Sequence, residues 1–299
     1  MKAPETPRDL PSTINRLVAS VETLTALLVH LGHVSGEKPV DSETALRVRA
    51  LAETVVDLDG VDPVVVRAQG AMGRAMLAQS AAFSASPDEP SAWAITDPFV
   101  LQMLGRGSSA FASIVVGEIA PTIEAFASRL ARDGLRVLDV GVGVAALSIA
   151  FANHLPTATV VGLDVWEPAL ALARSNIAAA GLEDRVEVRC EDVSVFADPE
   201  GFDLVWFAGP FIPGPLQPAG IAKCFESMRP GGWFVYGAFS GGDDPVVSAL
   251  GDLRTLRSGG PVLTTGEIVA MVRAAGLVDV EETVVAVGIA SRVVVGRRP

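Results

Sequence analysis

The spacing of hydrophobic and polar positions changes near residue 134 and divides the chain into two parts. Before that point, apolar residues recur at helical spacing, as at Ile14, Leu17 and Val21, and we find no convincing strand alternation. The stretch 84–91 (SASPDEPS) is typical of a loop. We expect helices over residues 14–28, 42–58, 63–83 and 109–131.

Beyond residue 134, short apolar strands alternate with helical segments. We expect strands at 136–140, 159–163, 186–190, 202–207 and 233–239, the last preceded by a turn at 230–232. We expect helices at 145–154, 168–180, 217–228, 245–257 and 265–275. Two final strands, 278–287 and 291–296, are close enough in sequence to pair antiparallel and to place one reversed strand at an edge. This alternation predicts an α/β, doubly wound fold: a mostly parallel seven-stranded sheet with an antiparallel C-terminal hairpin, covered by helices on both faces.

Composition narrows the class of protein. The 299 residues are 49% hydrophobic and 19% charged, which excludes a disordered chain. The net charge of −12 argues against nucleic acid as a partner, because phosphate binding needs clustered Lys and Arg. Two cysteines, Cys190 and Cys224, cannot form a disulfide framework and favour a reducing compartment. The longest uncharged runs are broken by prolines and polar residues, so we expect a cytoplasmic protein that does not enter a membrane.

A glycine-rich turn follows the first expected strand. Gly141 permits a sharp turn, and Gly143 lets a ligand approach the backbone. In doubly wound sheets, ligands bind at the carboxyl ends of the strands, so this turn is the first candidate site. By itself the turn also fits G-x-G-x-x-A, a form of the dinucleotide fingerprint.

The turn could bind a dinucleotide or another ligand. Three carboxylates at successive strand ends distinguish these two interpretations. Asp139 precedes the turn, where a carboxylate would repel a pyrophosphate but could hold an ammonium group, directly or through water. Asp164, after the second strand, can accept both hydroxyls of a ribose, and Asp192, after the third, can accept from an adenine amine. The set suits a ligand with an amino group, a ribose and an adenine, and without a phosphate.

These residues lie in segments that resemble the class I S-adenosylmethionine-dependent methyltransferases. The resemblance covers about residues 110–299 and rests on four motifs in family order: VLDVGVGVAALSIA (137–150), VVGLDVWEPALALARSNIAAAGLEDRVEVRCEDV (160–193), FDLVWFAGPF (202–211) and FESMRPGGWFVYGAF (225–239). It implies a Rossmann-like sheet and S-adenosylmethionine as cofactor. The cofactor-binding residues that it implies are Asp139, Gly141 and Gly143 for the methionine part, Asp164 and Val165 for the ribose side, Asp192 and Val193 for the adenine, and Ala208 beyond the fourth strand.

The fourth strand ends in a sequence that bears on the methyl acceptor. Family members that methylate amines often carry Asn, Asp or Ser before Pro-Pro and an aromatic residue, whereas this chain has Ala208-Gly209-Pro210-Phe211. The missing polar group disfavours an amine acceptor, so we expect a small, largely apolar molecule methylated at oxygen or carbon. Trp93, Asp97 and Arg106 precede the core and are further candidates for the acceptor site.

No catalytic base and no metal site is assigned. Methyl transfer from an activated sulfonium needs positioning more than side-chain chemistry, and the core motifs contain no evident base. His30 and His33 lack the further ligands of a metal site and fit ordinary helix packing.

The resulting hypothesis is a two-domain protein. Residues 1–108 form a helical region that caps the acceptor pocket or makes a homodimer, and residues 109–299 form the S-adenosylmethionine-binding domain. One alternative is a methyltransferase-like protein that binds the cofactor without transferring methyl, and a nicotinamide dehydrogenase is a more distant one.

Overall fold

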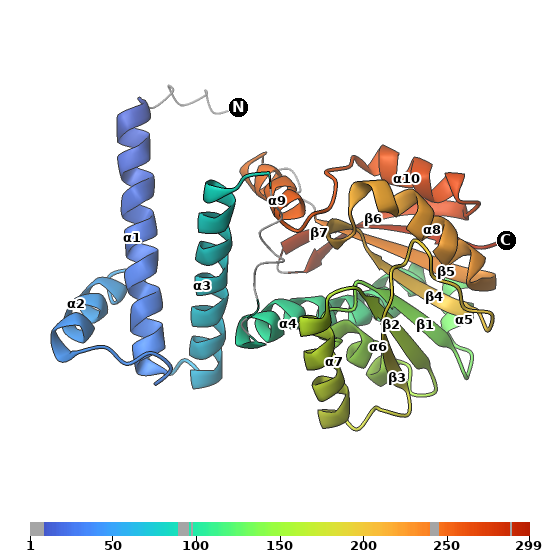
Figure 1. The fold of residues 1–299 in the computed structure, drawn as a ribbon, viewed down its shortest axis with the longest axis horizontal. Helices are drawn as coiled ribbons and strands as arrows, with labels where there is room; N and C mark the ends of the chain where they lie inside the picture. Colours follow the sequence, from blue (N-terminus) through green and yellow to red (C-terminus); the bar gives the residue numbers. More distant parts are fainter. Residues whose placement is uncertain (1–8, 89–95, 97, 240–244, 288) are drawn as a thin grey trace. The chain divides into compact units, whose positions relative to one another are not determined.

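The computed structural model describes residues 9–88, 96, 98–239, 245–287 and 289–299. The chain divides into two compact units, Met1–Ala81 and Ala82–Pro299, which Figure 1 draws as a helical part and an α/β part. The division lies before the expected boundary at residues 108 and 109, because the helix around residue 105 packs against the α/β core.

The first unit is helical, as expected. It contains α1 (Leu10–Val34), α2 (Ser42–Ala52) and most of α3 (Pro63–Ala85). Leu28, Leu31 and Val66 form its small core. Gly73 of α3 is required there, since a Cβ atom at this position would lie 2.4 Å from a methyl carbon of Leu28. Helix α2 ends six residues earlier than predicted, at Ala52, before a β-branched run at residues 54–56 that disfavours helix.

In the second unit, the helix that was expected to start at residue 109 begins earlier. Helix α4 (Pro98–Ile114) starts at a proline, which suits a first helical turn, and it packs on α6 (Ala146–His154). The prediction of a single helix over 109–131 is wrong. A π-helical turn (Val115–Ile119) and a 3-10 turn (Ala120–Thr122) separate α4 from α5 (Glu124–Leu130), because Pro121 cannot continue an α-helix.

The sheet has seven strands in the order β3-β2-β1-β4-β5-β7-β6. Their bounds are β1 Arg136–Val140, β2 Thr159–Asp164, β3 Val186–Cys190, β4 Phe202–Ala208, β5 Met228–Phe239, β6 Val278–Val287 and β7 Ile289–Arg297. Strands β1 to β5 are parallel, which confirms the doubly wound prediction. The order reverses between β1 and β4, and this switch point opens a crevice at the carboxyl ends of the strands.

Two details of the C-terminal half differ from the prediction. The expected turn at 230–232 lies within β5 as an irregularity, with Gly231 at φ +73°. The reversed strand is β7, which pairs antiparallel with both β5 and β6, so it lies inside the sheet and β6 forms the edge.

Helices cover both faces of the sheet because buried strand residues alternate between two cores. The remaining helices are α7 (Glu167–Ala179), α8 (Gln217–Glu226), α9 (Pro245–Arg257) and α10 (Thr265–Ala274). Val137, Leu204 and Trp206 join α5, α6 and α7 in one core. Leu138 and Val205, one residue out of phase, join α8 and α10 in the other. This period of two confirms that both faces are buried.

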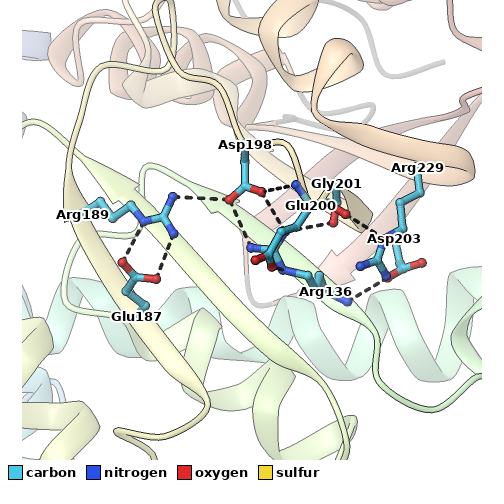
Figure 2. A network of polar contacts seen from close by, with 8 residues as sticks. All are labelled: Arg136, Glu187, Arg189, Asp198, Glu200, Gly201, Asp203 and Arg229. Carbon is cyan, nitrogen blue, oxygen red and sulfur yellow. Dashed lines mark hydrogen bonds and ion pairs between the residues drawn. The ribbon is translucent and has the colours of Figure 1, made fainter.

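A polar network anchors the β3–β4 connection (191–201), which contains turns in place of a crossover helix (Figure 2). The guanidinium of Arg136 donates to both carboxylate oxygens of Asp198, at 2.9 and 3.1 Å. Arg189 adds a contact of 3.4 Å to Asp198, and the backbone N–H of Arg136 donates to Asp203 at 2.8 Å. Hydrogen bonds from Arg136 and the nearby arginine charges lower the pKa of Asp198 to about 2. The connection thereby returns to the start of β4 and leaves residues 191–193 at the crevice.

Candidate functional site

A cavity of about 290 Å³ lies within the second unit at the carboxyl ends of β1, β2 and β3. The β1–α6 turn, the β4–α8 segment and α4 complete its wall. Its lining residues are Leu101, Gly105, Ser108, Val140, Gly141, Val142, Gly143, Val144, Leu163, Asp164, Val165, Trp166, Ala169, Glu191, Asp192, Val193, Phe211, Ile212, Pro213 and Leu216. The cavity therefore lies at the switch point of the sheet, where the sequence places the ligand.

The β1–α6 turn needs its glycines. Gly141 has φ +81° and Gly143 has φ +53°, in the left-handed region that favours glycine. The N–H groups of Gly141 and Val142 both donate to Leu163 O, at 2.9 and 3.0 Å, which ties the turn to β2. A Cβ atom at Gly141 would lie 3.1 Å from the Cβ of Ala208. The turn is thus held against β2 and β4 and presents backbone to the cavity.

The end of the turn carries a local backbone cost just before α6. Ala145 is at φ +64°, a conformation that an L-residue with a side chain adopts at a cost of about 1–2 kcal/mol. Ala145 is fully buried and the helix α6 starts directly after it.

Asp164 ends β2 and lines the cavity. Its Oδ2 accepts from the Gly143 N–H at 2.9 Å, and its Oδ1 accepts from the Trp166 N–H at 3.0 Å. Burial raises the pKa of this carboxyl, and the backbone hydrogen bonds from Gly143 and Trp166 oppose that rise. Each carboxylate oxygen keeps a second lone pair, so Asp164 can still accept hydrogen bonds from a ligand.

Asp139 lies beneath the turn and does not line the cavity. It is 1% exposed, and its Oδ2 accepts from the hydroxyl of Ser148 at 2.6 Å. Burial raises the pKa of Asp139 to about 7, and the nearby Asp164 carboxylate adds to the rise. Any effect of Asp139 on a ligand therefore passes through the turn above it or through Ser148.

The adenine-side candidates lie at the end of β3. Asp192 accepts from the Ser194 N–H at 2.8 Å in a local turn, and Val193 is buried against Gly220 of α8. Val165, next to Asp164, is exposed at 53%.

The structure brings six of the eight predicted cofactor residues to one cavity. Gly141, Gly143, Asp164, Val165, Asp192 and Val193 line it, whereas Asp139 and Ala208 lie behind the turn. Trp93 and Asp97 are outside the described residues, as is the side chain of Arg106.

A pair of hydrogen-bonded side chains, Gln102 of α4 and Asn176 of α7, was not predicted from the sequence. We call this pair the clamp. The side-chain amide of Gln102 donates to Asn176 at 2.7 Å, and Asn176 donates back to Gln102 at 2.9 Å and to Val144 O at 2.8 Å. Gly105 allows this approach, since a Cβ there would lie 2.2 Å from a Val144 methyl carbon. The clamp holds one wall of the cavity. Its residues lie in ordinary helical patterns, so no local signal marks them.

The cavity's polar side chains define the ligands it can accept. Asp164, Glu191 and Asp192 are its carboxylates, and ionised carboxylates accept hydrogen bonds and attract cations. This set fits a ligand that offers hydroxyl and amine donors with a positive charge, and it repels a phosphate. The residues present therefore fit a sulfonium nucleoside.

Comparison with known proteins points the same way. Residues 137–232 match a family model described as a methyltransferase domain. The release factor glutamine methyltransferase of Gloeobacter violaceus is 36% identical over 96 residues, which are 32% of each chain. The ribosomal RNA small subunit methyltransferase C of Escherichia coli (strain SMS-3-5) is 39% identical over 80 residues, 26% of this chain and 22% of that protein.

The fold extends the likeness over nearly the whole chain. The structure of human N-acetylserotonin methyltransferase in complex with S-adenosylmethionine matches with a TM-score of 0.66 at 15% identity, and covers 100% of this chain and 99% of that one. The alignments to the two curated relatives span about a third of those proteins or less.

Proposed function

We propose that this chain, a class I S-adenosylmethionine-dependent methyltransferase by its match to a methyltransferase-domain model and to curated methyltransferases, transfers methyl to a small, largely apolar acceptor at oxygen or carbon. The observation that carries the proposal is the composition of the cavity. Carboxylates lie on its β2–β3 side, and apolar residues lie on its β4–α8 side.

The carboxylate side would hold the cofactor. Asp164 would accept from the ribose hydroxyls, Asp192 with Val193 would meet the adenine, and the backbone of Gly141 and Gly143 would line the methionine part. Bound there, S-adenosylmethionine supplies a methyl group already activated by the sulfonium charge. Asp139 and Ala208 would support the turn from behind, because neither lines the cavity.

The apolar side would receive the acceptor. Phe211, Ile212, Pro213 and Leu216 form this rim, and Leu101 of α4 lies on the same cavity. The side chain of Phe211 is 43% exposed and packs edge-on against Phe239, with ring centroids 6.0 Å apart. Small-ligand pockets are mostly apolar with a few placed polar groups, which fits such an acceptor.

The chain's contribution to transfer would be positioning and the exclusion of water. Among the described residues that line the cavity, the carboxylates belong to the β2 and β3 ends. His154 ends α6, whereas the cavity is lined by the turn that precedes that helix, up to Val144. We therefore assign no general base.

Two of the relatives act, by their names, on a protein glutamine and on ribosomal RNA. Neither acceptor class is favoured for this chain. Ala208 stands where amine-methylating relatives carry the polar residue that accepts from the amine, and the net charge of −12 opposes approach of a polyanion.

A panel of acceptors with methyl-radiolabelled S-adenosylmethionine tests the proposal. Phenolic or polyketide-like acceptors should be labelled in preference to primary amines and RNA. Preferential labelling of RNA or of an amine would overturn the acceptor class. Cofactor binding without labelling of any acceptor would favour the alternative, a cofactor-binding protein that does not transfer methyl.

We also propose that the helical region, residues 1–108, contributes a homodimer interface through α1. The first half of α1 carries an exposed apolar stripe, formed by Leu10, Ile14, Leu17, Val18, Val21 and Leu24. A second copy presents the same stripe, so a two-fold contact would bury both. Large apolar side chains exposed together on one helix face are typical of a contact surface.

Helix α1 is also long and apolar enough to cross a membrane by length and composition, since an 18-residue window of it has a mean hydropathy of 1.5. Arg16 and Glu22 lie within it, and a charge inside a bilayer is expensive. We therefore favour the dimer, and a cytoplasmic location, over insertion.

A further inference from the structure

We propose that Gln217 and Tyr236 are positioning residues that set the shape of the acceptor-side rim. This inference rests on the proposed function, because it assigns the β4–α8 segment (209–216) to acceptor binding. The two side chains lie behind that segment and are almost completely buried, at 1% and 2% exposure.

Gln217, the first residue of α8, closes the segment on itself. Its side-chain Nε2 donates to Gly209 O at 2.8 Å and to Ile212 O at 2.9 Å. These two carbonyls lie at the beginning and in the middle of the β4–α8 segment. One amide group therefore fixes the bend of the backbone between them.

Tyr236 of β5 orients that amide. Its hydroxyl donates to Gln217 Oε1 at 2.8 Å, which leaves Nε2 directed at the two carbonyls. The buried ring stacks on Phe207, with centroids 5.6 Å apart and planes 21° apart. All three polar atoms of the pair are thereby engaged, and a fully satisfied buried network rigidifies its surroundings.

The backbone of Gly209 lies directly against the tyrosine ring. A Cβ atom at Gly209 would be 2.1 Å from Tyr236 Cζ, so any other residue would displace the ring or the strand end. Amine-methylating relatives often carry a polar residue at the position of Ala208 and a proline at the position of Gly209. In this chain, the buried pair holds the loop from behind.

The loop before α10 supports the rim from another side. A Cβ atom at Gly260 would lie 2.4 Å from Pro210 O, so the two backbones are in contact. The rim residues Phe211, Ile212 and Leu216 then take their places in the cavity wall from a backbone fixed at Gly209, Pro210 and Ile212. The Gln217–Tyr236 pair, which does not line the cavity, would act on an acceptor only through this backbone.

The test measures binding of 2-naphthol, a planar apolar phenol, to the full chain saturated with S-adenosylhomocysteine. The variants are Tyr236→Phe, Gln217→Met and the double variant. Each single change should weaken 2-naphthol binding about fivefold or more, the usual effect of one lost buried hydrogen bond. The affinity for S-adenosylhomocysteine should stay within about twofold, because the carboxylate side is untouched. The double variant should be no worse than the poorer single one, since both changes disable one network.

Trp233→Phe is the matched control. Trp233 is an equally buried aromatic residue of β5, but it stacks on Phe126 in the opposite core. This variant should lose thermal stability while keeping wild-type affinity for 2-naphthol.

Three results would overturn the assignment: no saturable 2-naphthol binding by the wild type, equal weakening by Trp233→Phe, or unchanged binding in Tyr236→Phe. Failure of S-adenosylhomocysteine to bind the wild type would instead remove the proposed function. Because binding is measured rather than turnover, absence of methyl transfer leaves the comparison of variants valid.

Discussion

The Oδ2 atom of Asp164 accepts a hydrogen bond of 2.9 Å from the backbone N–H of Gly143. This contact joins the end of β2 to the turn that follows β1, and the Trp166 N–H holds the other oxygen at 3.0 Å. The carboxylate is therefore fixed before any ligand arrives. A preorganised acceptor loses little conformational entropy on binding, which suits Asp164 to hold the ribose of a cofactor.

Gly141→Ala should impair both folding and cofactor binding. The φ of +81° and a contact of 3.1 Å with the Ala208 Cβ make an added methyl group costly. We expect the free energy of unfolding to fall by about 1–2 kcal/mol and the affinity for S-adenosylhomocysteine to fall with it. Gly134→Ala is the control, since Gly134 has φ +67° with open space around it, and lies before β1. Equal loss of affinity in both variants, by calorimetry, would contradict a specific role for the turn.

Asp139→Asn should change how stability depends on pH. The pKa of Asp139 is raised to about 7, whereas an unfolded aspartate ionises near pH 4 (about 3.9). Between these values the folded state binds the extra proton, so this group makes the free energy of unfolding fall as pH rises from about 4 to about 7. The neutral variant lacks that fall, and its stability relative to wild type should increase across this range. Urea unfolding at several pH values measures it, and a constant difference would show that Asp139 is ionised normally.

Asp198→Asn should destabilise the β3–β4 connection. The pKa of Asp198 is lowered to about 2, chiefly by the hydrogen bonds from Arg136, so its stabilisation is complete above about pH 4 and is lost as pH falls towards 2. At pH 7 the variant should lose about 2–3 kcal/mol, and the difference should vanish near pH 2. Glu187→Gln, whose side chain is 58% exposed in the same network, should cost under about 1 kcal/mol. Similar losses for both variants in urea unfolding would contradict the special role of Asp198.

Charges on the α1 stripe should separate the proposed dimer. Light scattering should give twice the chain mass of 31.0 kDa for the wild type and the chain mass itself for a Leu17→Glu, Val21→Glu variant. Ser20→Glu, on an exposed polar position of the same helix, should remain dimeric. A monomeric wild type that co-sediments with lipid vesicles would instead show that α1 meets a membrane.

The α/β part of the fold was predictable because its strands are short and apolar and are bounded by turn-forming residues. The bounds of β1 and β3 agree with the prediction to the residue, and β2 and β4 differ by one. Burial on both faces gives such strands continuous apolar runs. The place of β7 inside the sheet was not readable, since a hairpin can join an edge by either of its strands.

The helices that precede β1 in the second unit were less predictable, and for local reasons. The π turn after Ile114 depends on how Pro121 is accommodated, and α4 extends beyond the expected start because its apolar face packs on α6. The motifs led to six cavity residues. Asp139 was expected to hold an ammonium group of the ligand, directly or through water, but it lies buried under the turn, and burial of this kind is a tertiary property. The Gln217–Tyr236 and Gln102–Asn176 pairs join residues 19 and 74 positions apart, which no sequence period reveals.

The most direct test of the account is calorimetric titration of S-adenosylhomocysteine into the wild type, Asp164→Asn and the control Asp184→Asn. Asp184 is an exposed residue just before β3, so its variant carries the same change in charge away from the cavity. We predict saturable binding by the wild type and by Asp184→Asn, with affinity about 10- to 100-fold weaker in Asp164→Asn, as expected for a lost charge-assisted hydrogen bond. Equal affinity in all three proteins, or no binding by the wild type, would contradict the role of Asp164 in binding the cofactor.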